Sequence, residues 1–268
     1  MSVVAASAAP LRTRAFPAQW SARFAWVGLC LYTIYAASLL DVTFARFVQG
    51  IENGARFFDR MFPPNLAADK LALLSTGMLE SIQIAILSTF FGVLLSLPLG
   101  LMAARNLTPG WLSWSARGLI AVLRSFHSVI VAILFVKAVG FGALAGILAL
   151  IVSTMGFISK LFADAVEEMS MKQVEAVRAT GASFFSVLAM GVFPQVMARF
   201  IGFATYQLDS NLRNSTMVGL VGGGGIGATL FTAYQRFDYD FVLTILLAII
   251  AIIMAMDLVA GRLRRIFQ

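Results

Sequence analysis

Three glycines in the last quarter of the chain have the spacing of a nucleotide-binding loop. Gly222, Gly224 and Gly227 fit the pattern G-x-G-x-x-G and follow a short β-branched run. In a Rossmann-type domain, such a loop holds the phosphates of a dinucleotide against the N-terminus of a helix. That interpretation requires a parallel β-sheet around the loop, so it depends on the elements that carry these glycines.

Residue types for catalysis or metal binding are sparse. The chain has one histidine, His127, and one cysteine, Cys30, so it cannot assemble an intrachain disulfide or a His/Cys metal site. Its 13 acidic residues show no metal-ligand spacing, and the sequence has no G-x-x-x-x-G-K-[ST] motif. We therefore predict no catalytic residue, no metal site and no ATPase site in this chain. His127 is expected to be a core or interface imidazole.

Composition indicates a chain that crosses a membrane several times. Of the 268 residues, 60% are hydrophobic and 12% are charged, whereas ordinary globular domains have about 25% charged residues. The mean hydropathy is +0.88. The formal charge of +7 comes from basic residues scattered between apolar runs, without the basic face typical of nucleic-acid binding. We predict an all-α membrane protein that lies in a lipid bilayer and binds no nucleic acid.

Six apolar runs approach the length of about 20 residues that a bilayer span requires. They cover residues 24–40, 82–103, 119–139, 144–161, 198–212 and 241–260. The N-terminus does not resemble a cleavable signal, because Arg12, Arg14 and Arg23 precede a longer apolar stretch. Lys and Arg are more frequent on one side of the predicted spans, and the C-terminal GRLRRIFQ strengthens that bias. Both termini are therefore predicted to be cytoplasmic.

This topology divides the chain into four parts. Residues 1–23 form a cytoplasmic tail, and residues 24–40 form the first span. Residues 41–72 form an extracytoplasmic segment, and residues 73–268 form a core of five spans with a cytoplasmic loop at 162–194. In the outer segment, apolar residues recur every three or four positions before a Pro-Pro pair, which predicts an amphipathic helix at the membrane interface. A docking surface or a lid over a pore is the alternative.

The long cytoplasmic loop carries the main functional signal. It begins as a helix with Glu168 four residues before Lys172, the favourable order for a surface ion pair. Gly181 then suits a helix C-terminus, and Ser183 suits the N-cap of a second helix. An apolar corner that needs a partner is expected after this break, formed by Phe184, Phe185, Val187, Leu188 and Met190. A helix hairpin that packs only on itself is the alternative.

The same loop resembles the E-A-A-x-x-x-G motif of bacterial ABC-importer permeases, in which a proline follows nineteen residues after the Glu. Glu175, Ala176, Gly181 and Pro194 have that spacing, with Val177 in place of the second Ala. In that family, the short helix of the motif sits in a groove of the ATP-binding subunit. The resemblance therefore implies that a set of six residues couples the chain to an ATPase. These residues are Glu175, Ala176, Gly181, Ala182, Ser183 and Phe184.

Further segments resemble permeases of the phosphonate-uptake branch, from about residue 100 to the C-terminus. They include GFGALAGILAL and NLRNSTMVGLVGGGGIGATLFTAYQRFDYDF, whereas His127 stands where that branch has Pro. The resemblance implies a type I permease of the bacterial cytoplasmic (inner) membrane. It implies that the chain imports phosphonates or related phosphorus oxyanions, such as phosphite and hypophosphite, by alternating access. It also implies a homodimer with a second permease copy, two subunits that bind ATP and Mg, and an extracytoplasmic substrate-binding protein.

Polar residues at the ends of two spans are candidates for the translocation path, because charges in a membrane usually face protein or water. They are Glu80, Gln83, Asp209, Arg213, Asn214, Ser215 and Thr216. Asp209 and Arg213 are four residues apart and could simply pair across one helical turn. Alternatively, Arg213 together with Asn214, Ser215 and Thr216 could meet an oxyanion as it enters.

The glycine run lies between the fifth and sixth predicted spans, near the outer side and away from cytoplasmic ATP. No parallel sheet is expected there, so we reject the nucleotide site and predict a tight bend. Gly222, Gly223, Gly224, Gly225 and Gly227 would act either as a hinge or as a place of close helix packing. Two other functions stay open for the whole chain: a permease for another small solute, and a stand-alone secondary transporter or channel.

Overall fold

The computed structural model describes residues 20–40 and 43–267, which form helices joined by turns and short extended links. This described part contains no strand, in agreement with the predicted all-α class. The chain divides into two compact units, Met1–Asp59 and Arg60–Gln268. Most of the predicted cytoplasmic tail, including Arg12 and Arg14, lies outside the described residues.

The first unit holds helix α1 (Trp20–Leu39) and most of α2 (Phe44–Met61). α1 contains an apolar stretch of 18 residues, and none of it is buried inside the chain, which suits a helix surrounded by lipid. α2 ends just before Pro63 and Pro64, as its apolar repeat and the Pro-Pro pair predict. The predicted amphipathic helix therefore forms, while its place at the membrane interface stays a prediction.

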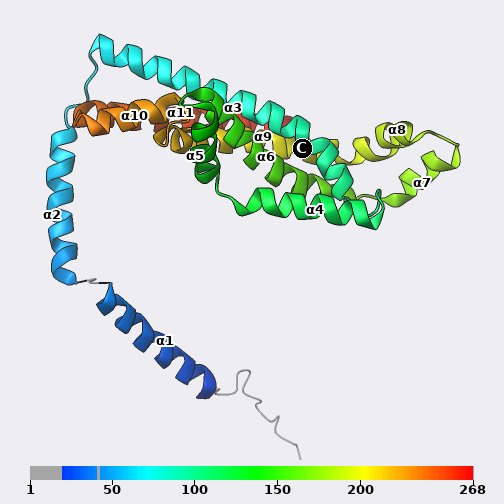
Figure 1. The fold of residues 1–268 in the computed structure, drawn as a ribbon, viewed down its shortest axis with the longest axis horizontal. Coiled ribbons are helices and arrows are strands. Elements are labelled where there is room, and N and C mark those ends of the chain that lie inside the picture. The colour runs from blue at the N-terminus through cyan, green and yellow to red at the C-terminus, as the bar shows by residue number, and fades with distance from the viewer. Residues whose placement is uncertain (1–19, 41–42, 268) are drawn as a thin grey trace, which may run out of the picture. The chain divides into compact units, whose positions relative to one another are not determined.

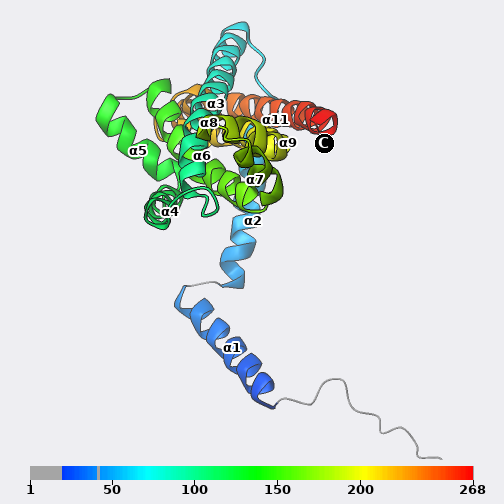
Figure 2. The same ribbon diagram turned by 90° about the vertical axis from the view of Figure 1, so that its right-hand side faces the viewer.

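The second unit is built on two long helices that lie side by side, α3 (Ala68–Ala103) and α6 (Ala143–Glu167) (Figures 1 and 2). A Cβ atom at Gly92 of α3 would lie 2.5 Å from the Thr154 side chain of α6. Small residues let helix backbones approach closely, which favours helix association in a membrane. They recur along the buried face of α3 as Gly77, Ser81, Ala85, Ser88, Gly92, Ser96 and Gly100.

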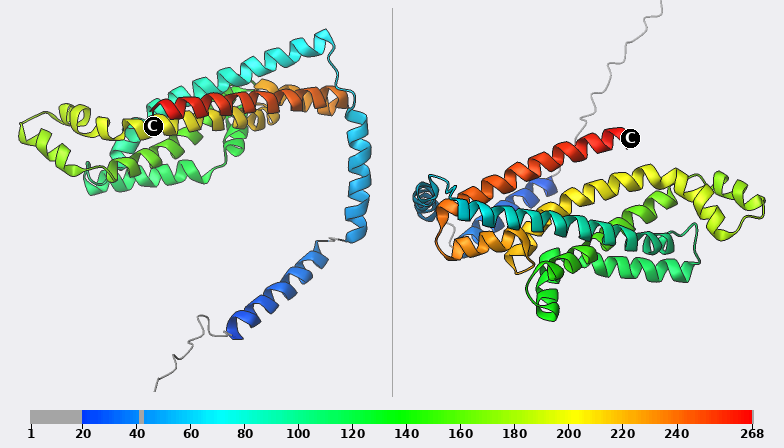
Figure 3. Two further views of the ribbon diagram at one scale, coloured as in Figure 1. Left: turned by 180° about the vertical axis from the view of Figure 1, so that it is seen from behind. Right: turned by 90° about the horizontal axis from the view of Figure 1, so that it is seen from above.

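The other helices of this unit flank the central pair. α4 (Gly110–Ser125) and α5 (Ser128–Val139) lie on one side of α6, and α9 (Phe193–Leu220) and α11 (Tyr239–Phe267) lie on the other (Figure 2). The connection from α6 to α9 consists of α7 (Met171–Ala179), α8 (Phe184–Val187) and the π-helical turn η1 (Leu188–Val192). α10 (Gly225–Gln235) joins α9 to α11. Figures 1 and 3 show α7 and α8 at one end of the unit and α10 at the opposite end.

Five helical stretches of the described chain are long and apolar enough to cross a membrane, and the pair α4–α5 makes a sixth if it counts as one span. The prediction of a continuous span over 119–139 is wrong, because the chain bends by 88° between α4 and α5. His127 has extended backbone angles at the bend, and its Nδ1 accepts a hydrogen bond of 3.4 Å from the Val129 amide. The exposed imidazole therefore caps α5 and is not a core group, while its expected place at an interface stays a prediction.

The helices extend beyond the apolar runs that predict them. α3 begins at Ala68 rather than near Ile82, and α9 continues to Leu220 rather than ending near Leu212. The prediction of a simple bend between the last two spans misses α10, an 11-residue helix that follows the glycine run directly.

Candidate functional site

A hairpin formed by α7, Gly181 and α8 lies at one end of the second unit (Figure 1). Gly181 has a φ of +76°, a left-handed conformation that favours glycine, and its amide donates to the Arg178 carbonyl at 3.0 Å. Ser183 is the N-cap of α8, and its Oγ accepts a hydrogen bond of 3.4 Å from the Ser186 amide. Together these two features reverse the chain between α7 and α8.

The base of the hairpin belongs to a buried apolar core. Val174 of α7 packs with Val187 and Leu188 in a cluster that also contains side chains of α6 and α9. The burial of Val187 and Leu188 corrects the expectation that both form part of an exposed apolar corner. The exposed apolar surface near the apex comes from Phe184, Phe185 and Met190, which are 54%, 80% and 73% exposed.

Polar side chains of α9 fasten the hairpin at its entrance. The Gln195 amide group accepts a hydrogen bond of 3.0 Å from the Ser170 amide and donates to the Gly191 carbonyl at 2.6 Å. The Arg199 guanidinium pairs with Glu168 at 2.6 Å. The predicted pair between Glu168 and Lys172 is therefore wrong: α6 ends at Glu167 and α7 begins only at Met171, so the two side chains do not share one helix. These contacts link the hairpin to the first turns of α9.

The six residues predicted for ATPase coupling lie together on α7 and at the apex of this hairpin. Ala182 is half-buried against the apolar core. A Cβ atom at Gly181 would meet nothing within 4 Å, so the apex is open on that side. The hairpin thus presents a small surface flanked by a carboxylate and an aromatic ring, and the exposed members of the set are Glu175, Ala176, Gly181, Ser183 and Phe184.

The glycine run forms a turn at the far end of α9. Gly222, Gly224 and Gly225 have φ values of +100°, +79° and +72°, which side chains with a Cβ rarely adopt. The Gly222 carbonyl accepts a hydrogen bond of 2.9 Å from the amide of Gly142, which precedes α6. The amide of Ile226 donates to Ser81 Oγ of α3 at 2.8 Å. The glycine turn, residues 222–227, therefore joins the ends of α9 and α10 to α3 and α6.

Backbone atoms come so close at the glycine turn that a side chain would collide with a carbonyl oxygen. A Cβ would lie 2.0 Å from the Thr216 oxygen at Gly227, 2.3 Å from the Gly223 oxygen at Gly146, and 2.4 Å from the Gly224 oxygen at Gly219. Carbonyl oxygens of packed helices cannot move aside as a flexible side chain can. The packing depends on Gly146 and Gly219 as well as on the run itself, although neither was singled out from the sequence.

Two of the residues predicted for the translocation path lie on α3. Glu80 is half-buried beside the glycine turn, where its Oε1 would be 2.7 Å from a Cβ atom at Gly224. Gln83 is exposed on the same helix. Glu80 is therefore close to the turn.

Three more of these residues occupy the end of α9. Asn214 donates a hydrogen bond of 3.4 Å to Ser210 Oγ, and Ser215 is buried and donates to the Leu212 carbonyl at 2.7 Å. The Thr216 carbonyl faces Gly227, as described above. Intrahelical and packing contacts thus occupy these groups, and whether they meet a solute stays a prediction.

Asp209 and Arg213 form an ion pair across one turn of α9, which corresponds to the pairing alternative considered from the sequence. The Arg213 guanidinium also lies 3.7 Å from Asp257 of α11. The Asp209 side chain is only 4% exposed, and its Oδ1 is buried without a hydrogen-bond partner in the described structure. Sequence reasoning missed Asp257, because no spacing signal relates α11 to α9.

A buried hydrogen-bond network, also missed from the sequence, joins α3, α6 and α9. Asn211 Nδ2 donates to Thr89 Oγ1 and to Thr154 Oγ1, at 2.9 Å in both cases. Asn211 Oδ1 accepts from Gln207 Nε2 at 3.0 Å. The least buried of the four side chains is Thr89, at 8% exposure. Each polar group therefore relies on the others for hydrogen bonds that water supplies elsewhere.

Replacing Asn211 by leucine is expected to lower the free energy of unfolding by about 1–3 kcal/mol, because Thr89, Thr154 and Gln207 each lose a buried hydrogen bond to Asn211. Thermal unfolding of the purified chain in detergent measures the loss. Asn53→Leu on the exposed surface of α2 is the control, with an expected change within about 0.5 kcal/mol. Equal stability of the two variants would contradict a stabilising role for the network.

The chain is similar to known membrane-transport proteins. Residues 96–268 match the family described as "Binding-protein-dependent transport system inner membrane component". The chain is 36% identical to the phosphate-import permease protein PhnE of Mycolicibacterium smegmatis over 257 residues, which cover 95% of this chain and 47% of that protein. It is 36% identical to the phosphite transport system permease protein PtxC of Stutzerimonas stutzeri over 242 residues, which cover 90% of this chain and 86% of that protein. The chain thus spans about half the length of the first relative and most of the second.

The fold is also similar to that of a solved structure. A chain of the inward-facing MetNI methionine ABC transporter superimposes with a TM-score of 0.68 and 24% sequence identity, covering 76% of this chain and 100% of that chain. At this identity the likeness concerns the fold alone. The region that matches the family begins within α3 and contains both the hairpin and the glycine turn.

Proposed function

The chain belongs to the family of binding-protein-dependent transport system inner membrane components, and on this premise we propose that it is the membrane-spanning subunit of an ATP-driven importer. It is a transport subunit and not an enzyme, and ATP and Mg are bound by separate ATPase subunits. Two copies of the chain form the pore, and an extracytoplasmic binding protein delivers the solute. The observation that carries this proposal is the hairpin, whose apex is exposed while its base is buried in the core.

In this proposal the hairpin and both termini face the cytoplasm, and the glycine turn lies toward the outer side of the inner membrane. The support is the excess of Lys and Arg around the predicted inner loops. The hairpin and α10 also lie at opposite ends of the second unit (Figure 1), as a cytoplasmic coupling site and an outer mouth require.

The proposed solute is a phosphonate or a related phosphorus oxyanion. The support is the resemblance to phosphonate-uptake permeases and the similarity to relatives named for phosphate import and phosphite transport. In such a system the binding protein selects the solute, so its affinities for methylphosphonate, phosphite and phosphate identify the cargo. Failure to bind any of the three would contradict the proposed solute class.

Transport proceeds by alternating access in this proposal. ATP binding draws the ATPases together and moves the hairpins that they hold. Gln195 and Arg199 connect each hairpin to the start of α9, and the far end of α9 contacts the glycine turn. A change at the hairpin can therefore reach the outer end of the bundle through one helix.

Replacing Phe185 by serine is expected to reduce the ATPase that co-purifies with the chain by at least about fivefold, because a buried aromatic contact at an interface contributes about 1 kcal/mol or more. Phe185 is 80% exposed in the chain alone, so the change leaves the core intact. The measurement is the ATPase retained on affinity-tagged chain extracted from its native host in detergent.

Phe44→Ser provides the matched control, because Phe44 is 81% exposed and lies on α2, away from the hairpin in sequence. This variant should retain ATPase as the unmodified chain does. If no ATPase co-purifies with the unmodified chain, the importer proposal is wrong, and a stand-alone transporter or channel becomes the better explanation. Retention by Phe185→Ser would contradict the docking role of the apex.

A further inference from the structure

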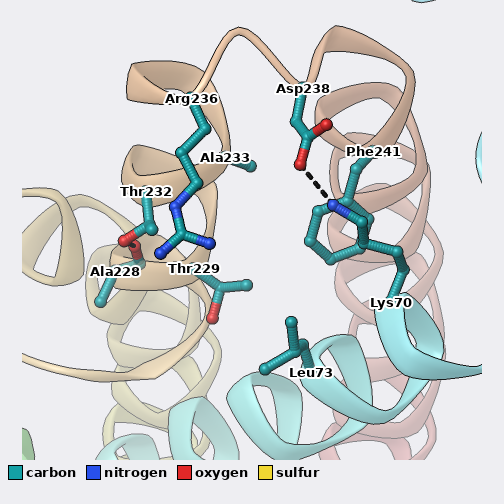
Figure 4. A pocket seen from close by; sticks show the side chains of 9 residues that line it. All are labelled: Lys70, Leu73, Ala228, Thr229, Thr232, Ala233, Arg236, Asp238 and Phe241. Carbon is teal, nitrogen blue, oxygen red and sulfur yellow. Dashed lines mark hydrogen bonds and ion pairs between the residues drawn. The ribbon is translucent and has the colours of Figure 1, made fainter.

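A pocket of about 310 Å³ opens between the start of α3, α10 and the link from α10 to α11. Figure 4 shows nine side chains around it, from Lys70 and Leu73 on α3 to Phe241 on α11. Its volume falls at the lower end of the range of small-molecule sites, about 300–1,000 Å³. The pocket belongs wholly to the second unit. α10, which forms one wall of the pocket, lies at the end opposite the hairpin (Figure 1).

The charges around this pocket are unequal. The Lys70 ammonium group pairs with Asp238 and lies 5.0 Å from the centre of the Phe241 ring, so its charge is largely satisfied. The amide of Arg236 donates to the Thr232 carbonyl at 3.1 Å, but its side chain forms no ion pair or hydrogen bond with the described residues. Figure 4 shows its guanidinium extending along α10 into the pocket, close to Thr229 and Thr232. The nearby Asp240 does not line the pocket and accepts a hydrogen bond of 2.9 Å from Asn65. The guanidinium therefore supplies an excess positive charge that lacks a partner.

The chemistry of the lining suits a small tetrahedral oxyanion. A guanidinium presents a planar fork of N–H donors that matches two oxygens of a phosphate-type group. Leu73, Ala233 and Phe241 provide apolar surface for a hydrogen or methyl substituent on phosphorus. One unpaired cation attracts an anion without the tight binding that would stop its passage.

We propose that this pocket is a weak entry site for a tetrahedral phosphorus oxyanion, in which the Arg236 guanidinium binds the oxygens. The inference deepens the proposed function and rests on it for the side of the membrane and the solute class. The pocket then receives solute at the outer end of the bundle, next to α10 and the glycine turn. Asp238 limits the affinity by holding the Lys70 charge.

The test measures direct binding by the full chain, without ATPase or binding protein. The chain is placed in nanodiscs of phosphatidylcholine and titrated with methylphosphonate, and ³¹P line broadening reports binding. Arg236→Gln is expected to weaken binding about tenfold, because it removes a charge-assisted hydrogen-bond donor. Asp238→Asn is expected to strengthen binding about threefold, because it releases the Lys70 charge. A gain in affinity cannot result from a misfolded variant, so the two changes together keep the test decisive.

Lys137→Gln is the matched control, because it removes one exposed cation on α5, also on the predicted outer side. Binding should stay within about twofold of the unmodified chain, since this cation lies outside the pocket. Equal losses in Arg236→Gln and Lys137→Gln, or no change in Arg236→Gln and Asp238→Asn, would overturn the proposal.

A lipid headgroup offers the same phosphate chemistry, so a second arm uses nanodiscs that contain phosphatidylglycerol. Suppose that methylphosphonate does not bind, while phosphatidylglycerol raises the thermal midpoint of the unmodified chain but not of Arg236→Gln. The occupant of the pocket is then a lipid headgroup, and the proposal of a solute entry site is wrong. The outcomes also separate the two proposals. If methylphosphonate binds but no ATPase co-purifies, the entry-site proposal stands and the importer proposal is wrong. If an ATPase co-purifies but methylphosphonate does not bind, only the entry-site proposal is wrong.

Discussion

Replacing Gly227 by alanine should lower the free energy of unfolding by about 3 kcal/mol or more, at the upper end of overpacking effects in well-packed cores. The added methyl group would lie 2.0 Å from the Thr216 oxygen and 2.9 Å from the Gly219 Cα. Both are backbone atoms of α9, so relief requires α9 and α10 to separate along their contact. The yield of folded chain in membranes and its thermal midpoint in detergent measure the effect.

Gly118→Ala is the matched control, because a Cβ atom at Gly118 on α4 would meet nothing within 4 Å. Alanine is the better helix former, so this variant should be as stable as the unmodified chain or slightly more stable. If Gly227→Ala is equally well tolerated, the close contact between α9 and α10 is not a requirement of the fold. The glycine turn would then have to be explained by flexibility instead of packing.

Replacing Gly181 by asparagine should reduce solute uptake about tenfold or more while the chain still folds. Asparagine tolerates a left-handed backbone better than other side chains, and the position is open in the isolated chain. The added Cβ therefore meets no atom of the chain within 4 Å. In the proposed docking, the new side chain would obstruct the ATPase contact at a cost of about 2 kcal/mol or more of binding free energy. Uptake of labelled methylphosphonate by cells and ATPase co-purification measure the loss.

Two further variants serve as controls for Gly181→Asn. Gly118→Asn adds the same side chain at an open position of α4, and its uptake should match that of the unmodified chain. Gly181→Val should lose both uptake and some stability, because a β-branched residue is strained at a φ of +76°. Normal uptake and normal ATPase retention in Gly181→Asn would mean that the apex does not dock.

The features that local sequence rules predicted are those that depend on near neighbours. α2 stops before Pro63 and Pro64 because proline cannot continue a helix. The hairpin turns at Gly181 and Ser183 because their intrinsic preferences match a helix end and a helix start. The apolar runs predicted the existence of the long helices, although not their full lengths.

The features that were missed depend on residues far apart in the chain. Asn211 finds Thr89 at a separation of 122 residues, and no periodicity connects the two positions. α10 follows a glycine-rich stretch of poor helix propensity, but its first turn is held by Ser81 of α3. The bend before α5 lacks both Gly and Pro, and the run through residues 119–139 looks continuous because the capping role of His127 appears only in three dimensions.

The ions and hydrogen bonds of the candidate sites show the same limit. The four-residue spacing of Asp209 and Arg213 suggested their pair, whereas Asp257 comes from another helix. Helical spacing predicted an ion pair between Glu168 and Lys172. Because α6 ends at Glu167, Glu168 pairs with Arg199 instead. Spacing rules identify a partner only when one uninterrupted helix carries both residues.

The unbroken length of α9 makes it a stiff lever between the two ends of the second unit. Its 28 residues extend for about 42 Å at 1.5 Å per residue. A tilt of about 5° at the hairpin would carry the other end through about 4 Å. The widened turn of η1, just before α9, can bend. The close contact between Thr216 and Gly227 near the C-terminal end of α9 leaves no space for movement. If the hairpin moves α9, the contact between Thr216 and Gly227 cannot be compressed. α10, and the pocket wall that it forms, must therefore move together with α9.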